Sequence, residues 1–235
     1  MSGPVHGEPA YVLHRRPYRE TSLLVDLFTL NTGRLSVLAR GANSPKSPLK
    51  AQLQPFQPLL VDWQGRSELK TLLRLEVRSA PAIKGTLPLY SGLYLNELLQ
   101  RLLPSAEPCP ELFAAYIDVL NELAVNRDVE PLLRQFERLF AQALGFGFAW
   151  DQANDTGETV EPQRRYCYDP QQGIVLVPTE TVRLRELPGQ VLLQLAEGNY
   201  QAPECRQLAK RVMRVLIDHL LQGRPLHSRT LFQKG

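Results

Sequence analysis

The 235-residue chain is 43% hydrophobic and 22% charged, and its formal net charge is +3. This length suits one large domain or two small ones, and the hydrophobic fraction is enough to build a core. No apolar run approaches the ~18 residues of a membrane span, and the first nine residues lack the basic start and apolar stretch of a signal peptide.

Charge is distributed unevenly along the chain. Residues 1–80 contain 11 Lys and Arg against 6 Asp and Glu, whereas residues 81–235 contain 16 against 18. A second basic segment runs from Arg206 to the end, with seven Lys and Arg against Asp218 alone. Because phosphate binding depends on clustered cations, this asymmetry is more typical of a nucleic-acid-binding protein than of a metabolic enzyme.

Five short strands are predicted in the first eighty residues. Side chains alternate with a period of two over 10–16, 23–28, 35–39, 59–63 and 69–78, as in half-buried strands. In the last strand, the odd-numbered positions from Leu69 to Val77 are expected to share one face. Residues 40–50 contain two prolines and three cations without apolar periodicity, so we predict a loop. This pattern fits a small closed barrel of the OB type.

Helical periodicity replaces the alternation after residue 81. Apolar side chains recur every three or four positions over 95–102, 113–123, 132–143, 190–197 and 205–222. Between these helices, residues 151–178 are polar and irregular, with a short β-ribbon predicted at 164–168 and 174–177. The predicted fold class is therefore α+β, with an N-terminal five-stranded barrel followed by helices.

The usual sequence motifs of catalysis and metal binding are missing. The chain contains no P-loop, HExxH, GxSxG or GxGxxG, and no pair of carboxylates stands out by its spacing. Cys109, Cys167 and Cys205 form no CxxC pair, which favours reduced thiols and a cytoplasmic location. No histidine lies near Cys167 in sequence, so no metal is expected. We therefore predict a protein that is not an enzyme and needs no cofactor.

Six stretches of sequence carry a resemblance to a known family. They are AYVLHRRPYRETSLLVDLFT at 10–29, GRLSVLARGA at 33–42, LQPFQPL at 53–59, LYSGLYLNELLQRLL at 89–103, LLRQFERLFAQALGFG at 132–147 and GRPLHSRTLF at 223–232. In this order they resemble the RecO family of bacterial recombination mediators, and in particular its gammaproteobacterial branch.

The resemblance implies a three-part molecule. It implies an OB-fold DNA-binding domain at 1–80, a helical domain at 81–150 that continues at 179–235, and an intervening region at 151–178. In some members of the family that region is a four-cysteine zinc module. Only Cys167 lies in it here, so we expect a degenerate, metal-free module held by packing against the helices alone.

The resemblance also implies the function. Members of the family bind single- and double-stranded DNA, anneal complementary strands, and bind the acidic, phenylalanine-ended tail of single-stranded-DNA-binding protein (SSB). With RecR they help RecA displace SSB, in the RecFOR pathway of DNA repair and recombination after DNA damage. This implies a cytoplasmic, nucleoid-associated protein whose partners are DNA, SSB and RecR.

Basic side chains of the predicted barrel are the candidate DNA contacts, because cations bind phosphates without reading bases. Tyr11, Tyr18, Phe28 and Trp63 would stack on bases if they were exposed. The alternatives are that the cations form only a solvated face and that the aromatic residues belong to the core. The candidate cations are Arg15, Arg16, Arg34, Arg40, Lys46, Lys50, Lys70 and Arg74.

The candidate for binding the SSB tail is Arg134, which lies in the stretch that matches the family's tail-binding helix. An acidic peptide ending in Phe needs a cation for its carboxylates and an apolar pocket for its ring. Leu132, Phe136 and Leu139 are the expected apolar neighbours, and Arg138 lies one turn away. The alternative is that Arg134 is a surface residue paired with a nearby acid.

Two questions stay open at the level of the sequence: the function itself and the role of the C-terminal basic segment. The chain also fits an RNA-binding OB protein, for example in ribosome assembly, or a non-catalytic adaptor that docks partners through its helices. The C-terminal basic segment either extends the DNA surface or serves solubility alone. Its cations are Arg206, Lys210, Arg211, Arg214, Arg224 and Arg229.

Overall fold

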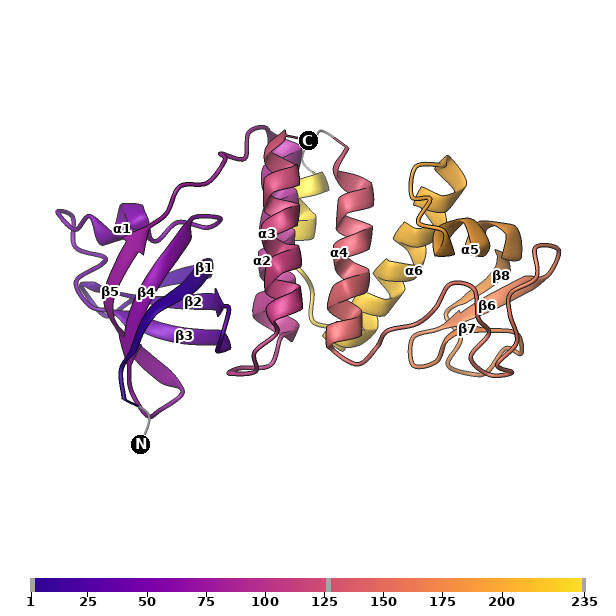
Figure 1. Cartoon of the computed structure of the whole chain (residues 1–235), viewed down its shortest axis with the longest axis horizontal. Helices are drawn as coiled ribbons and strands as arrows, with labels where there is room; N and C mark the ends of the chain where they lie inside the picture. The colour runs from indigo at the N-terminus through magenta and orange to yellow at the C-terminus, as the bar shows by residue number, and fades with distance from the viewer. Residues whose placement is uncertain (1–2, 126–127, 234–235) are drawn as a thin grey trace. The chain divides into compact units, whose positions relative to one another are not determined.

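A computed structural model describes residues 3–125 and 128–233 (Figure 1). The chain divides into two compact units. Unit 1 comprises Met1–Arg127 and Leu226–Gly235, and unit 2 comprises Asp128–Pro225. This division does not follow the predicted segments, because the helices expected at 81–150 are shared between the two units.

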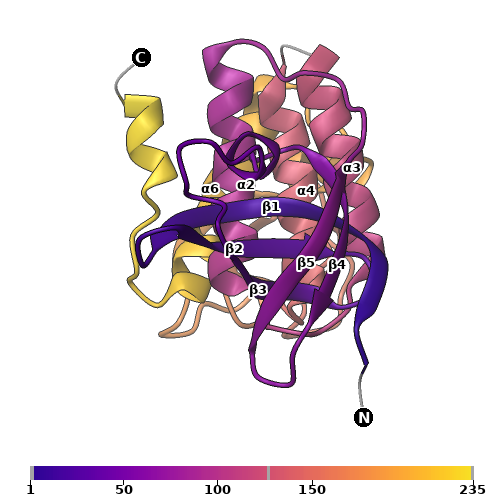
Figure 2. The same ribbon diagram turned by 90° about the vertical axis from the view of Figure 1, so that its left-hand side faces the viewer.

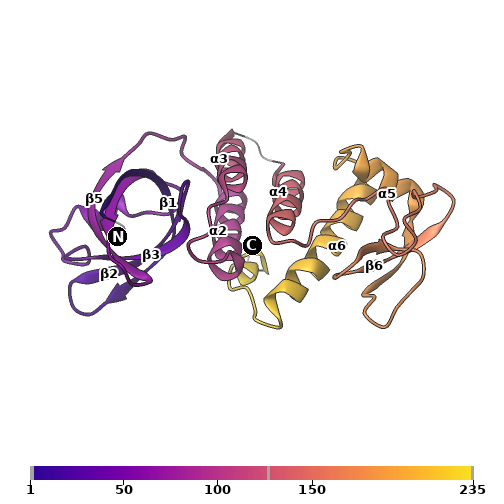
Figure 3. The same cartoon turned by 60° about the horizontal axis from the view of Figure 1, so that its bottom comes forward.

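The five predicted strands form a closed barrel in unit 1, which confirms the OB-type architecture. They are β1 (Val5–Tyr18), β2 (Ser22–Thr29), β3 (Gly33–Ala39), β4 (Pro58–Gln64) and β5 (Leu69–Val77). The order around the barrel is β1-β2-β3-β5-β4, and β4 closes onto β1. All neighbours are antiparallel except β3 and β5. Figure 2 shows β4 and β5 crossing β1–β3, and Figure 3 looks into the ring of strands.

Alternation places the barrel core as expected in four strands, but it fails in β5. Leu72 and Leu75 pack against the core, whereas Leu73 and Val77 are 47% and 40% exposed. The prediction that Leu73 shares a face with Leu75 is therefore wrong, whereas Val77 and Leu75 lie opposite the core residues Leu59 and Val61 and do share one. The cause is a register irregularity: Val61 and Trp63 are two residues apart on β4, but their partners on β5 are three apart.

A pair of helices covers the outer face of the barrel. They are α2 (Thr86–Leu102) and α3 (Pro110–Val125). Tyr11 and Phe28 of the barrel meet Phe113 and Tyr116 of α3, with ring centroids 5.2 to 5.9 Å apart. All four rings are buried, so this aromatic cluster joins barrel and helices as one body.

Polar groups in the same join fix its geometry. The buried Asn96 amide donates to the carbonyl oxygens of Val12 (3.2 Å) and Leu13 (3.1 Å). Asp26 accepts hydrogen bonds from Ser36 (2.5 Å) and from Gln100 of α2 (2.9 Å). Burial alone would raise the pKa of Asp26, but these bonds and the contact with His14 outweigh it and lower the pKa to about 2.

The last described residues return to unit 1. A 3-10 helix, η1 (Ser228–Gln233), packs against α2. The Glu97 carboxylate accepts the amides of His227 (2.9 Å) and Ser228 (2.8 Å) and the Ser228 hydroxyl (2.6 Å), and it pairs with Arg101. No sequence pattern predicted this segment.

Unit 2 joins helices to a small sheet. Its elements are α4 (Val129–Ala143), β6 (Arg165–Asp169), β7 (Gly173–Val175), β8 (Leu184–Pro188), α5 (Gly189–Ala196) and α6 (Pro203–Leu221). The sheet order is β7-β6-β8, so the predicted ribbon gains a third strand. Tyr166, Tyr168 and Ile174 of the sheet share a core with Leu192 of α5 and Met213 of α6.

Two carboxylates order the region at 151–178, where a degenerate zinc module was predicted. Asp155 accepts the amides of Leu176 (2.9 Å) and Val177 (2.8 Å). The fully buried Asp169 accepts two amides and two threonine hydroxyls. Packing against helices is therefore only part of what orders this region. Within residues 3–125 and 128–233, no group of three or more His, Cys, Asp or Glu side chains is arranged to hold a metal ion.

Candidate nucleic-acid interface

The barrel face that OB-folds commonly use for oligonucleotides is covered in this chain. That face is formed by the second and third strands, and here it packs under α2 and α3 through Phe28 and Asp26. Arg34 is part of this join, because its Nε donates to the carbonyl oxygen of Leu103 (2.7 Å). Arg34 is thus engaged with the protein itself, and its Nε is not available to a ligand.

The structure brings five of the eight predicted cations to one end of the barrel. The turn between β1 and β2 is joined to the 40–50 loop by a bond from the Asn43 amide to the Thr21 carbonyl (2.8 Å). Arg15 donates to the Lys50 carbonyl and to Gln54 Oε1, so it also ties the loop to β1. The cations at this barrel end are Arg15, Arg16, Arg40, Lys46 and Lys50.

The loop is more ordered than its composition suggested. A single helical turn, α1 (Leu49–Gln52), follows Pro48, and Leu53 is fully buried in the barrel core. Arg40, Lys46 and Lys50 are nevertheless exposed. The loop therefore presents its cations from a backbone that is anchored at both ends.

Arg19 was missed by the sequence prediction, although it belongs to the same barrel end. It lies in the turn between β1 and β2 with a φ of 54°, and its guanidinium lies 5.4 Å from the centre of the Tyr18 ring. Its position in the first inter-strand loop, a common ligand-binding loop of OB-folds, is the signal that could have found it. Tyr18 is half-buried, whereas Tyr11, Phe28 and Trp63 are buried.

Lys70 and Arg74 lie along β5 and not in the end loops. Lys70 Nζ is 5.5 Å from the centre of the Trp63 ring and donates to the Gly65 carbonyl (3.3 Å). Arg74 is exposed, and in the register it lies opposite Asp62 of β4. Both cations therefore lie on the side of the barrel, along β5, which pairs with β3 and β4.

The barrel end carries mostly cations, and the exposed Glu20 in the turn between β1 and β2 is an acid beside them. Among the described residues, Arg16, Arg19, Arg40, Lys46 and Lys50 make no ion pair. Exposed, unpaired cations concentrate anions and release counterions when a polyanion binds. This arrangement suits a sugar–phosphate backbone and offers few aromatic faces to bases.

The residues predicted to bind the SSB tail do not share one face of α4, because some are buried in the core and others lie at the surface. Phe136 is fully buried and stacks on Phe140, and the Arg134 side chain is only 11% exposed and pairs with Glu137 (2.8 Å). On a different part of the helix surface, Leu139 is 48% exposed. Leu132 and Arg138 are half-buried.

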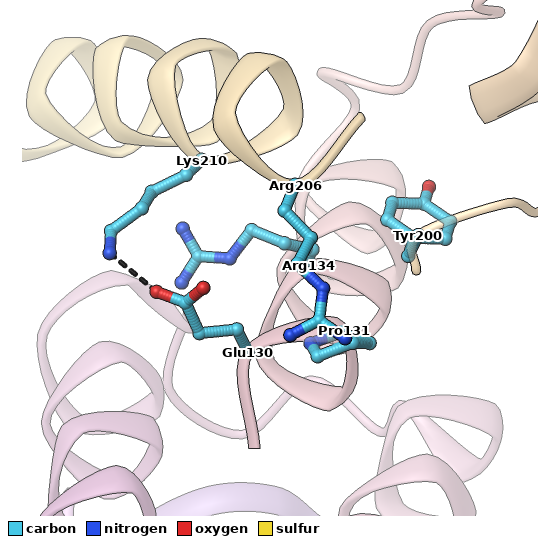
Figure 4. Close-up of a pocket in the computed structure, with 6 residues that line it drawn as sticks. All are labelled: Glu130, Pro131, Arg134, Tyr200, Arg206 and Lys210. Atoms are coloured by element: carbon cyan, nitrogen blue, oxygen red, sulfur yellow. Dashed lines mark hydrogen bonds and ion pairs between the residues drawn. The ribbon is translucent and has the colours of Figure 1, made fainter. Parts of the chain in front are cut away.

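Two hollows adjoin α4 in unit 2. Arg138 lines an open groove of about 420 Å³, together with Gln142, Phe148 and neighbouring residues up to Asn154. Arg134 lines a small pocket with Arg206 and Lys210 (Figure 4). The groove is thus lined by both a cation and an aromatic ring, whereas the lining of the small pocket is mainly cationic.

Comparison with known proteins covers both units. The family described as "Recombination protein O N terminal" matches residues 1–81, and "Recombination protein O C terminal" matches residues 87–230. A protein of Marinobacter nauticus named DNA repair protein RecO is 65% identical over 235 residues, which is 99% of this chain and 96% of the relative. A protein of the same name from Pseudomonas aeruginosa PAO1 is 46% identical over 225 residues, or 96% and 94%. The chain therefore belongs to the RecO family of DNA repair proteins.

Proposed function

We propose that this RecO protein binds single- and double-stranded DNA at the barrel end and anneals complementary strands without nucleotide hydrolysis. In this role it also binds the SSB tail and acts with RecR to load RecA, close to the nucleoid. The observation that carries the proposal is the set of exposed cations without ion-pair partners at that end. The family membership supports a place in DNA repair.

The proposed mechanism of annealing is charge neutralisation. Cations that bind phosphates lower the repulsion between two strands, and phosphate contacts carry no sequence information. Because most aromatic side chains of the barrel are buried, the bases of a bound strand are left free to find their complements. No step of this mechanism needs ATP.

A strand-annealing assay tests this function. Complementary oligonucleotides, one labelled with a donor and one with an acceptor dye, are mixed with and without SSB in the absence of ATP. Annealing well above the spontaneous rate is expected in both cases. DNA binding without annealing would favour the adaptor, and tighter filter binding of RNA than of DNA would favour the RNA-binding alternative.

Binding of the SSB tail is proposed for the cationic surface of α4. The terminal Phe of the peptide fits the groove beside Phe148, and Arg138 at its edge and Arg134 one turn away supply charge to the carboxylates. We expect Arg134→Ala and Arg138→Ala each to weaken binding of a labelled SSB tail peptide about tenfold, which corresponds to about 1.4 kcal/mol. Fluorescence anisotropy measures this.

Arg134→Ala removes a cation that pairs with the buried Glu137, so a loss of stability can mimic the loss of a peptide contact. Arg138 makes no ion pair among the described residues, and its substitution is therefore the cleaner test. Arg211→Ala, at an exposed position of α6, is the matched control. Wild-type peptide affinity in both α4 variants would remove this helix from the binding site.

A further inference from the structure

The small pocket beside Arg134 brings three cations together from two helices. Arg134 comes from α4, and Arg206 and Lys210 come from successive turns of α6 (Figure 4). Pro131 and the buried Tyr200 complete its walls. The Nε of Arg134 is buried and has no hydrogen-bond partner among the described residues. The pocket has no room for a water molecule as it stands, so an added acceptor reaches this donor only when a lining side chain moves.

Two acids of the same unit occupy the cations of α6. The Asp128 carboxylate accepts hydrogen bonds from both terminal nitrogens of Arg206, at 3.0 and 2.6 Å. Glu130 receives Nζ of Lys210 at 2.5 Å, the pair drawn as a dashed line in Figure 4. Both acids come from 128–130, where α4 begins, so a short acidic segment of the chain itself is bound across the cations.

These contacts are of a kind that another anion can replace. The side chains of Lys210 and Glu130 are 61% and 44% exposed, and those of Arg206 and Asp128 are 30% and 39% exposed. Ion pairs at this exposure contribute little to stability and are screened by salt. A peptide with several carboxylates that is also held by contacts on α4 can therefore replace Asp128 and Glu130 as the partner of Arg206 and Lys210.

We propose that Arg206 and Lys210 are additional ligands for the acidic peptide, and that Asp128 and Glu130 occupy them until the peptide displaces these acids. The inference rests on the proposed binding of an acidic tail at α4. It adds a competition built into the chain, in which the intramolecular acids set the affinity and the charge requirement of the site.

The test is the double variant Asp128→Asn with Glu130→Gln. It keeps the size of both side chains and removes the competing charges, so we expect a labelled acidic peptide ending in Phe to bind about tenfold more tightly than to the wild type. Arg206→Gln with Lys210→Gln is expected to weaken binding, and to weaken it more when the two acids are already neutral. Isothermal titration at two salt concentrations measures both effects.

A charge control separates exchange from a general electrostatic effect. Glu180→Gln with Glu186→Gln removes two exposed acids of unit 2 that line neither the pocket nor the groove. Its peptide affinity is expected to stay within about twofold of the wild type, because exposed charges outside the site are screened in buffer. Equal gains in the control and in the test variant would overturn the inference.

The remaining outcomes are also decisive. If the test variant stays folded in a thermal scan and binds the peptide no better than the wild type, the acids do not compete and the inference is wrong. Glu130→Gln alone provides the same comparison if the double variant unfolds, since the Lys210 pair is the more exposed one. If neither wild type nor variants bind, the proposed tail binding itself fails. Binding by the variant alone would show a fully occluded site.

Discussion

Reversal of the three loop charges, in the variant Arg40→Glu, Lys46→Glu and Lys50→Glu, is expected to weaken binding of single-stranded DNA on the order of 100-fold. The three side chains are exposed and make no ion pair among the described residues. The variant therefore loses three phosphate contacts and gains repulsion at the same place. The slope of log affinity against log salt is expected to become shallower by about 2, since each contact on a single strand contributes about 0.7.

Anisotropy titrations of a labelled oligonucleotide over a series of salt concentrations give both quantities. The matched control reverses three exposed cations outside the barrel end, Lys84, Arg165 and Arg185. It changes the net charge by the same amount, so it measures the contribution of overall charge alone. Unchanged affinity in the loop variant, or an equal loss in the control, would remove the 40–50 loop from the DNA site.

The largest expected effect on stability is that of Asp169→Asn. This carboxylate is fully buried and accepts the amides of Gln171 (2.8 Å) and Gln172 (3.3 Å) and the hydroxyls of Thr179 (3.0 Å) and Thr181. Asparagine replaces one acceptor oxygen by a donor and removes the charge, which leaves buried groups without partners. We expect unit 2 to lose about 3 kcal/mol of unfolding free energy at neutral pH.

The same contacts predict how this loss depends on pH. Burial alone would raise the pKa of Asp169, but the hydrogen bonds outweigh it and lower the pKa below its ordinary 3.8. A lowered pKa in the folded state contributes stability above 3.8 that is lost as the pH falls through the folded-state value. The difference between wild type and Asp169→Asn should therefore be constant near neutrality and shrink in acid.

Urea unfolding followed by tryptophan fluorescence measures this loss unit by unit. The chain has two tryptophans, Trp63 in the barrel and Trp150 in the core of unit 2, so a Trp63→Phe background reports on unit 2 alone. Asp151→Asn, an exposed acid near Trp150, is the control and is expected to change little. Identical urea midpoints for Asp169→Asn and wild type would contradict the role assigned to these bonds.

Local sequence patterns predicted the elements of this fold well. The five strands and the helices α2 to α6 all lie where apolar periodicity placed them, because that periodicity is set by the element itself. The orientation of Leu73 was not predictable, since it depends on the register with β4. The gathering of Arg16 and Arg40 was predictable in part, because both flank loops of one barrel.

Contacts between distant residues limit what the sequence can say about the site. In the sequence, Arg34 cannot be told apart from an exposed cation on a strand. Only the fold shows that its Nε donates to the carbonyl oxygen of Leu103, 69 residues later. The same holds for Asp155, whose partner amides lie 21 and 22 residues away. For Arg134, pairing with Glu137 lies within one helical turn and was one of the two alternatives stated.

The return of η1 to α2 has a consequence for biosynthesis. The Glu97 carboxylate accepts the amides of His227 and Ser228. During translation these hydrogen bonds can form only after all of unit 2 has been synthesised. A nascent chain therefore exposes part of α2 for the whole of that interval, in which more than a hundred residues separate the two partners. Unit 1 therefore completes its folding last, because η1 can pack against α2 only after unit 2, which is inserted between them in sequence, has been synthesised.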